Sequence, residues 1–403
     1  MTERAEVAIV GGGPAGAVLA GRLARAGVGV VVLERSPAWR WRAGGVFSSP
    51  ATMAALRRAG VDPTTLTTVA RPIAAMRVET PSGSTFRLTY GADRGGEPAI
   101  GFDRSALDPA LLRLAATAGA DVRRAWTVTR VELDVVPAVI HARGPDGAET
   151  VLAADVVVGA DGLRSIVARS AGVARATFLG ERVGLTYHLA DDTDRPCPDA
   201  RMRILRDGYV GVAPVPGGRV NVGIVLGRSW RGRLARQGAG GVAREIVGGI
   251  PPAPDDSAAW RDGTPLDQIA GASPLGHRVT RRAGERWLLV GDAAGFLDPF
   301  TGEGLHRALV SAELAAAAIL TARRGREGSF AAYDRAMRRR FLSKDAVSWL
   351  VQAFLARPAL FEYAARRIEA RPEVRATMGL VMGDLLPASR ALDPRYLAAL
   401  LAP

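Results

Sequence analysis

Residues 5–35 read AEVAIVGGGPAGAVLAGRLARAGVGVVVLER, and this stretch decides the fold of the N-terminal part of the chain. The apolar run Val7–Val10 predicts a short β-strand. The residues from Pro14 to Ala26 predict a helix, and the apolar run Val28–Leu33 predicts a second strand. In this order the three elements form a β–α–β unit.

The turn between the first strand and the helix carries the pattern Gly-x-Gly-x-x-Gly, at Gly11, Gly13 and Gly16. In a dinucleotide-binding turn the first glycine makes a tight turn, and the second lets the backbone approach a pyrophosphate. The third lets the helix pack closely against the strand. Pro14 and Ala15 begin the helix, whose N–H groups and dipole favour a phosphate at this end.

The second strand ends at Glu34, which is followed by Arg35. A carboxylate in this position can accept hydrogen bonds from both ribose hydroxyls of an adenosine. The complete unit therefore predicts a dinucleotide site that includes Glu34 and Arg35. The alternative is a tight β–α turn that binds nothing, and the motif alone does not distinguish NAD from FAD.

Composition favours a globular enzyme. The chain has 403 residues, of which 48% are hydrophobic, which suggests roughly two to three domains. Cys197 is the only cysteine, so no intramolecular disulfide can form. We expect no signal peptide and no membrane span, because no uncharged apolar run approaches ~18 residues. The resulting expectation is a cytoplasmic location.

The formal net charge of +13 does not predict nucleic-acid binding. The basic residues are scattered along the chain, and only 6% of the residues are aromatic. Nucleic-acid binders concentrate their charge on one face and interleave aromatic side chains. We therefore expect no nucleic-acid partner, while weak peripheral contact with an anionic membrane surface stays open.

The order of strand and helix signals predicts an α/β fold: a Rossmann-like nucleotide-binding domain interrupted by a β-sheet-rich substrate domain, with a helical C-terminal region. The nucleotide-binding domain is predicted at 1–70, 100–178 and 276–325, the β-rich domain at 71–99 and 179–275, and the helical region at 326–403.

Two further motifs follow apolar strands. GADGLRSIVAR, Gly159–Arg169, places Asp161 in a strand-to-helix turn, although Asp-Gly is also ordinary turn chemistry. RWLLVGDAAGFLDPFTGEGLHRAL, Arg286–Leu309, delivers Asp292 to the end of a strand. In such sheets ligands bind at the carboxyl ends of the strands. Asp292 can accept a hydrogen bond from a ribityl or ribose hydroxyl.

The same third motif predicts a loop and a helix beside a flat ring. Pro299 stiffens the loop, and Gly302 and Gly304 let backbone N–H groups approach closely, with Leu305 next in the helix. The N-terminus of that helix would stabilise negative charge on the N1–C2=O edge of a reduced flavin. A plain helix cap at this position is the local alternative.

Together the three motifs resemble those of the two-domain flavoproteins that include aromatic-ring hydroxylases, geranylgeranyl reductases and flavin-dependent halogenases. The resemblance implies FAD as the cofactor. The residues that it implies are Gly11, Gly13, Gly16 and Glu34 at the ADP part, Arg104 near the pyrophosphate, Asp161 in the Asp-Gly motif, Asp292 in the Gly-Asp motif at the flavin ribityl chain, and Arg42, Ala43 and Gly44 on the segment that passes the flavin.

The departures from the resemblance bear on the reaction. A halogenase would carry a Trp-rich motif and a lysine, whereas Trp39–Trp41 is not that motif and the only lysine, Lys344, lies in the helical tail. Prenyl reductases carry Cys, Trp and Phe at the positions that Ala43, Gly211 and Ala213 occupy here. Cys197 lies between two prolines and does not replace the missing cysteine.

We therefore expect a monooxygenase that acts on an apolar or aromatic small molecule through a C4a-hydroperoxyflavin. The alternatives are a geranylgeranyl-reductase-like C=C reductase of an isoprenoid chain and a non-catalytic nucleotide-binding protein. No catalytic side chain is assigned, and we expect no metal site. The candidates for catalysis are His306 and Tyr209, and those for substrate contact are Phe47, Tyr209, Phe296 and Phe300.

The sequence does not identify the electron donor, and two routes stay open. The sequence contains no second nucleotide-binding unit for NAD(P)H. The resemblance implies that NAD(P)H docks transiently on the FAD domain, or that a separate flavin reductase supplies the electrons.

Overall fold

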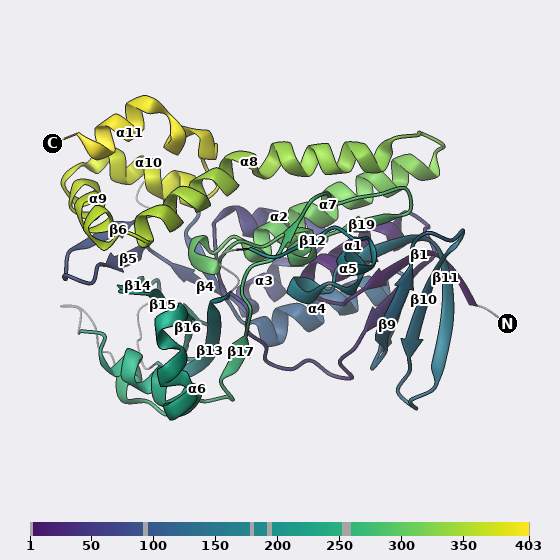
Figure 1. Cartoon of the computed structure of the whole chain (residues 1–403), viewed down its shortest axis with the longest axis horizontal. Coiled ribbons are helices and arrows are strands. Elements are labelled where there is room, and N and C mark those ends of the chain that lie inside the picture. Colours follow the sequence, from purple (N-terminus) through teal and green to yellow (C-terminus); the bar gives the residue numbers. More distant parts are fainter. Residues whose placement is uncertain (1–2, 92–95, 178–180, 192–195, 252–258, 403) are drawn as a thin grey trace.

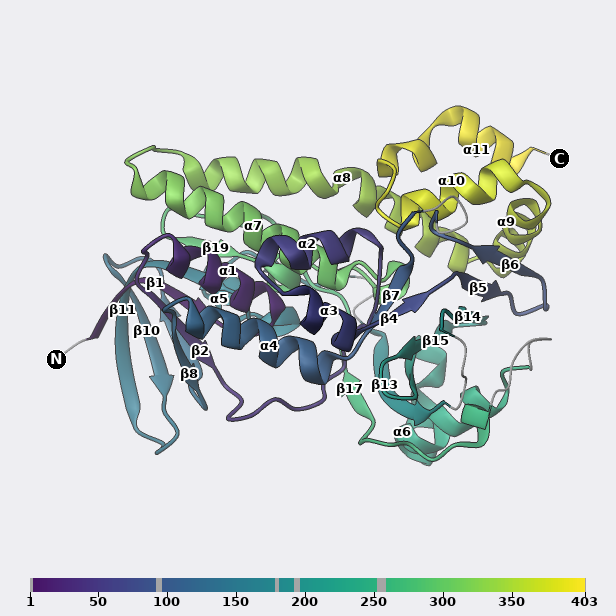
Figure 2. The same cartoon turned by 180° about the vertical axis from the view of Figure 1, so that it is seen from behind.

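The computed structural model describes residues 3–91, 96–177, 181–191, 196–251 and 259–402. Two large β-sheets lie toward opposite ends of the molecule, with a group of helices between them (Figures 1 and 2). The C-terminal helices form a separate group above the second sheet. The predicted fold class, an α/β fold with a Rossmann-like sheet, a second β-rich sheet and a helical C-terminal region, is confirmed.

The first sheet has the strand order β8-β2-β1-β11-β10-β9, and β19 pairs with the end of β11 on the edge opposite β1. Strands β8, β2, β1, β11 and β19 run parallel, while β10 is antiparallel to both of its neighbours, β11 and β9. The strands are β1 Glu3–Val10, β2 Val30–Glu34, β8 Asp121–Arg124, β9 Thr127–Glu132, β10 Ala138–Arg143, β11 Glu149–Gly159 and β19 Trp287–Leu289.

Helix α1 packs against both α4 and α7 in the first domain. Small residues make this close packing feasible, since Gly16, Ala17, Ala20 and Gly21 of α1 are buried. The helices of this part are α1 Pro14–Arg25, α2 Ala51–Ala59, α3 Pro63–Val69, α4 Arg104–Thr117, α5 Ile166–Ser170 and α7 Gly304–Arg323.

The second sheet is largely antiparallel and has the order β17-β13-β16-β15-β14-β5-β6. Alternate side chains of each strand point to opposite faces. One face packs on helix α6, Arg231–Gly248, through Leu185, Tyr187 and Leu189. The strands are β5 Met76–Glu79, β6 Thr85–Leu88, β13 Val183–Ala190, β14 Ala200–Leu205, β15 Gly208–Val215, β16 Arg219–Leu226 and β17 Ala270–Ala272.

Shorter elements join these layers. The three-stranded sheet β3-β7-β4 contacts β15 of the second sheet, and β12 pairs with β18. These strands are β3 Phe47–Ser48, β4 Ala70–Ile73, β7 Ala99–Phe102, β12 Ala174–Arg175 and β18 Arg278–Val279. The short 3₁₀ helices are η2 Gly162–Arg164, η4 Arg228–Trp230, η5 Ala259–Asp262, η6 Gly291–Ala294, η7 Pro299–Thr301 and η8 Ala388–Leu392.

The C-terminal part is helical. The long helix α8 packs along α7 and reaches η8, and α9 contacts strand β6 of the second sheet. The helices are α8 Ser329–Leu355, α9 Pro358–Ala370, α10 Pro372–Met382 and α11 Pro394–Leu401. This region therefore contacts both domains (Figure 1).

Helix α7 is the one described helix that is long and apolar enough to cross a membrane by length and composition. It packs against α1, α2 and α8, and most of its apolar window is buried inside the protein. We therefore interpret α7 as a core helix.

Candidate flavin-binding site

The sheet brings the three sequence motifs to one edge. Val10 at the end of β1 lies beside Gly159 at the end of β11, and Gly159 lies beside Leu289 of β19. Backbone hydrogen bonds continue past the strands, from Ala160 N to Val10 O at 2.8 Å and from Val290 N to Gly159 O at 2.9 Å. All three motifs thus begin at the carboxyl ends of adjacent parallel strands, where such sheets bind ligands.

The three glycines of the first turn have different surroundings. Gly11 has a φ of +105°, and a Cβ there would lie 2.4 Å from Ala160 O. A Cβ at Gly16 would lie 2.0 Å from Gly11 O. A Cβ at Gly13 would meet no atom within 4 Å. The first and third glycines therefore close the turn, and the second borders open space at the N-terminus of α1, as a pyrophosphate would need.

Glu34 is held at the end of β2 by three donors. Its Oε2 accepts from Gly12 N at 2.9 Å, and its Oε1 accepts from Ser36 N and from Arg42 Nη2, each at 2.9 Å. Burial opposes its ionisation, but these hydrogen bonds prevail and hold the pKa of Glu34 below its ordinary value. Glu34 is thus an oriented carboxylate beside the glycine turn, whereas the Arg35 side chain is exposed.

Asp161 has one oxygen in use and one without a partner. Its Oδ2 accepts from Ile166 N at 2.6 Å, whereas its Oδ1 is buried with no hydrogen-bond partner among the described residues. Burial raises the pKa of the Asp161 carboxyl. A buried acceptor without a donor is costly, so a hydroxyl of a bound cofactor would suit this position.

Asp292 lies in η6, which follows β19, and its carboxylate makes no hydrogen bond with the described residues. Burial raises its pKa to about 6, against the attraction of Arg104 and Arg307. Arg104 itself forms a two-bond ion pair with Asp108, at 2.6 and 2.8 Å. It also donates to Gly45 O at 3.0 Å, which ties α4 to the segment of Arg42 to Gly45.

The charge state of Asp292 leads to a prediction for the flavin-free protein. Because its folded pKa is raised from 3.8 to about 6, its ionisation destabilises the fold progressively across this interval and fully above it. Asp292→Asn should therefore raise the free energy of unfolding at pH 7 by about 2–3 kcal/mol and change little near pH 4.

The same variant should retain less FAD, because an amide replaces one of the two acceptor oxygens. Urea unfolding of the flavin-free protein and flavin content after purification measure the two effects. Asp155→Asn, at an exposed ion pair with Arg4, is the control. Unchanged flavin content in Asp292→Asn would contradict the assignment of Asp292 to the cofactor.

The segments beside Gly302 pack closely together. Gly302 has a φ of +67°, and a Cβ there would lie 2.5 Å from Phe47 Cδ1. Pro299 begins η7, and Gly304 begins α7, where an added Cβ would meet no atom within 4 Å. The N-terminus of α7 thus borders open space, while the side chain of the next residue, Leu305, is buried in the core.

Tyr209, on β15 of the second sheet, contacts the loop that carries Asp298 and Phe300. Its hydroxyl donates to Asp298 Oδ1 at 2.5 Å, and its ring meets Phe300 edge-on at 5.1 Å between centroids. Arg182 Nη1 donates to the other oxygen, Asp298 Oδ2, at 2.7 Å. Burial raises the pKa of Tyr209 well above its ordinary range, so Tyr209 is a neutral hydrogen-bond donor in this network.

The other candidates occupy different environments. Phe47 packs on Tyr90 with ring centroids 5.6 Å apart, and Phe296 pairs with His277 through two backbone hydrogen bonds of 2.7 Å. His306 is 5% exposed, and neither ring nitrogen has a partner among the described residues. Burial lowers the pKa of His306, which makes the neutral ring the stable form at neutral pH.

Sequence reasoning missed a polar group on the second sheet, formed by His188, Asp267, Asn221, Thr186 and Trp41. His188 lies in an apolar strand, and Asp267 lies 79 residues further along the chain. A histidine that alternates with the apolar residues of VGLTYHLA is the only local signal. Across the described residues, no cluster of His, Cys, Asp and Glu could hold a metal ion.

Comparison with known proteins places these features in a family. Residues 4–347 match the family described as FAD binding domain, so the chain belongs to this family of FAD-binding proteins. It is 30% identical over 322 residues to digeranylgeranylglycerophospholipid reductase 2 of Methanopyrus kandleri, which covers 77% of this chain and 75% of that protein.

Solved structures share the fold. A geranylgeranyl bacteriochlorophyll reductase-like protein from Thermoplasma acidophilum superposes with a TM-score of 0.77 at 22% identity, covering 98% of this chain and 99% of the other. The flavin-dependent brominase Bmp2 superposes with the same TM-score at 18% identity, covering 94% and 93%. The predicted resemblance is thereby confirmed, and the protein is an FAD-dependent oxidoreductase.

Proposed function

We propose that this protein is a monooxygenase that inserts oxygen into an apolar or aromatic small molecule. Bound FAD would supply the redox chemistry, since reduced flavin activates dioxygen. The chain would hold the ADP part at the Gly13 turn and Glu34, and the ribityl chain at Asp161 and Asp292. The protein then has to position the substrate and exclude water.

The observation that carries this proposal is the face of the second sheet that lies opposite α6. Tyr209, Ala213 and Val225 of that face pack with Phe300 and Phe47. On this face, between the Tyr209–Val225 pair and Ala213, Gly211 of β15 lies directly opposite Gly223 of β16. Both glycines are partly exposed, and a Cβ at Gly223 would meet no atom within 4 Å. This glycine strip leaves room for a flat substrate.

No thiol accompanies that surface. Ala43 occupies the position where the resemblance predicts a cysteine in prenyl reductases. The single cysteine, Cys197, is free and exposed in the segment before β14. Partial desolvation and the nearby Asp199 carboxylate raise its thiol pKa, which disfavours the reactive thiolate. Oxygen insertion requires no such proton donor, and this difference supports a monooxygenase.

A C=C reductase of an isoprenoid chain is the second candidate, and the relatives favour it. The digeranylgeranylglycerophospholipid reductase named above and a menaquinone reductase of Mycolicibacterium smegmatis are each 30% identical over more than three quarters of this chain. For either reaction we propose NAD(P)H as the electron source, delivered directly or through a separate flavin reductase.

The two candidates differ in the product that they form. The purified protein is incubated with NAD(P)H, a flavin reductase, dioxygen carrying the heavy oxygen isotope, and a panel of polyaromatic and prenylated compounds. We expect one product to gain a single labelled oxygen atom by mass spectrometry. A product that gains two hydrogen atoms, formed equally well without dioxygen, would show that the reductase assignment is the right one.

A further inference from the structure

A polar group interrupts the apolar surface at the end of the glycine strip. Thr186 and His188 of β13 alternate with Leu185, Tyr187 and Leu189, which pack on α6. Their side chains therefore point to the opposite face, the one that carries Gly211, Ala213 and Gly223. Thr186 pairs with Gly223 and His188 pairs with Asn221. The polar group thus begins directly beside the open position at Gly223.

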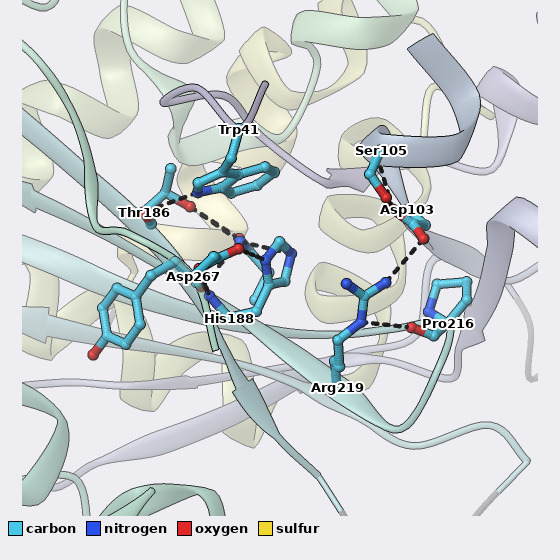
Figure 3. A network of polar contacts seen from close by, with 10 residues as sticks. Trp41, Asp103, Ser105, Thr186, His188, Pro216, Arg219 and Asp267 are labelled. Carbon is cyan, nitrogen blue, oxygen red and sulfur yellow. Dashed lines mark hydrogen bonds and ion pairs between the residues drawn. The ribbon is translucent and has the colours of Figure 1, made fainter. Parts of the chain in front are cut away.

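The imidazole of His188 is held on two sides (Figure 3). Its Nδ1 lies 2.6 Å from Asp267 Oδ2, and its backbone N donates to Asp267 Oδ1 at 2.8 Å. The ring of Trp41 lies over it with centroids 4.4 Å apart, and Trp41 Nε1 donates to Thr186 O at 3.1 Å. Both ring position and ring orientation are therefore fixed.

The carboxylate of Asp267 determines the tautomer of His188. A carboxylate only accepts, so Nδ1 carries a proton and donates it to Asp267, and in the neutral ring Nε2 carries the lone pair. Asn221 Nδ2 lies 3.4 Å from His188 Nε2, but its two hydrogens have shorter contacts, with Thr186 Oγ1 at 3.0 Å and Tyr187 O at 3.2 Å. The contact of 3.4 Å is long, so a better donor can replace it.

Charges near the group are already paired. Arg219 Nη2 lies 2.9 Å from Asp103 Oδ2, and Arg71 Nη1 lies 3.3 Å from Asp191 Oδ2. On the Trp41 segment, Arg42 is paired with Glu34. Asp267, whose side chain is 27% exposed, is therefore the carboxylate that acts on His188, whose side chain is 6% exposed. An imidazole with one nitrogen on a carboxylate and a lone pair on the other is the arrangement of a general base.

We propose that His188, oriented by Asp267, is the acid–base residue of the substrate site, and that the substrate carries an acidic hydroxyl, a phenol or enol, that docks beside Thr186 and Asn221. This inference rests on the proposed function. In the step, the O–H bond of the substrate breaks and a bond from that proton to His188 Nε2 forms. The electron pair stays on the substrate oxygen, and Asp267 stabilises the imidazolium. The electron-rich ring is then the better acceptor of an electrophilic oxygen.

The test uses a phenol whose ionised form has its own absorbance band. The FAD-loaded protein is titrated with 4-nitrophenol at a pH one unit below the pKa of the free phenol. We expect the difference spectrum of the wild type to show bound phenolate. His188→Gln and Asp267→Asn should weaken phenolate binding roughly tenfold to a hundredfold, because each removes a hydrogen bond to a charged group.

A matched control comes from a second histidine–carboxylate pair. His141 Nε2 lies 2.8 Å from Glu132 Oε1 in the first sheet, and His141→Gln should bind phenolate as the wild type does. Flavin content and thermal unfolding show that each variant is folded, and Asp267→Asn provides a second route if His188→Gln fails to fold. The proposal is wrong if the wild type binds no phenol, binds it un-ionised, or binds phenolate as tightly as His188→Gln does.

The two proposals can fail separately. If labelled oxygen enters the product equally in the wild type and in His188→Gln, the protein is a monooxygenase and the role of His188 is wrong. If the wild type binds phenolate through His188 but forms only a product with two added hydrogen atoms, the acid–base role stands and the proposed function is wrong.

Discussion

Replacing Lys344 with methionine is expected to lower the free energy of unfolding at pH 7 by about 3–5 kcal/mol. Lys344 is 4% exposed, and its ammonium group contacts Glu303 Oε1 and Asp384 Oδ1, each at 2.9 Å. It also donates to Val381 O at 2.8 Å. Methionine fills a similar volume but leaves two buried carboxylates without their cation.

The pH dependence of this loss follows from the same contacts. Burial raises the pKa of Glu303, against the attraction of Lys344. Burial is outweighed at Asp384, where Lys344, His306 and Ser49 hold the pKa below its ordinary value. Asp384 therefore stabilises the fold above its unfolded pKa, and this contribution is lost as the pH falls through the lower, folded value. Without Lys344 both carboxyls protonate more readily, so the deficit of the variant should shrink in acid.

Denaturant unfolding at several pH values measures this effect. Arg338→Met is a suitable control on the same helix, because Arg338 pairs with Asp334 at 2.9 Å but is 55% exposed. Such surface pairs contribute about 0–1 kcal/mol. Equal losses in the two variants, or a Lys344→Met deficit that grows in acid, would contradict the role assigned to the buried cluster.

The Lys344 cluster also relates the C-terminal region to the flavin site. Glu303 precedes Gly304, the first residue of α7, and Lys344 belongs to α8. Ser49, after the flavin-facing segment, donates to Asp384 Oδ2 at 2.8 Å. The residue before α7, helix α8 and the end of α10 thus meet at one ammonium group next to the loop that would contact the flavin ring, and Ser49 joins them through Asp384.

Sequence reasoning succeeded where the signal is local. The β–α–β unit depends on glycine placement and on apolar periodicity, and each of these signals lies within a short stretch of neighbouring residues. The three motifs meet in space because parallel strands end at one sheet edge, a rule of the fold rather than of any one residue. The positions of the glycine turn, Glu34 and Asp292 follow from that rule.

Contacts between distant segments were not predictable in the same way. Lys344 was interpreted only as a tail lysine that does not fit a halogenase, yet it is the centre of a buried ion cluster. His188 and Asp267 meet because strand β13 and the segment before β17 become neighbours in the second sheet. Such pairings depend on tertiary packing, for which neither periodicity nor spacing provides a signal.

The glycine turn allows cofactor binding to be separated from folding with a matched pair of substitutions. Gly13 has a φ of −70° and a ψ of −179°, which any residue adopts, and an added Cβ meets no atom. Gly13→Ala should therefore unfold as the wild type does. We expect its FAD affinity to fall roughly a hundredfold or more, because the methyl group occupies the space that a pyrophosphate would need.

Gly16→Ala should behave differently, since its Cβ would lie 2.0 Å from Gly11 O. The backbone must move, at a cost of about 1–3 kcal/mol, and flavin should be lost together with stability. Flavin titration and thermal unfolding of both flavin-free variants give the comparison. If Gly13→Ala retained FAD with wild-type affinity, the cofactor would not approach the chain at the second glycine, and the assignment of the pyrophosphate to the N-terminus of α1 would be wrong.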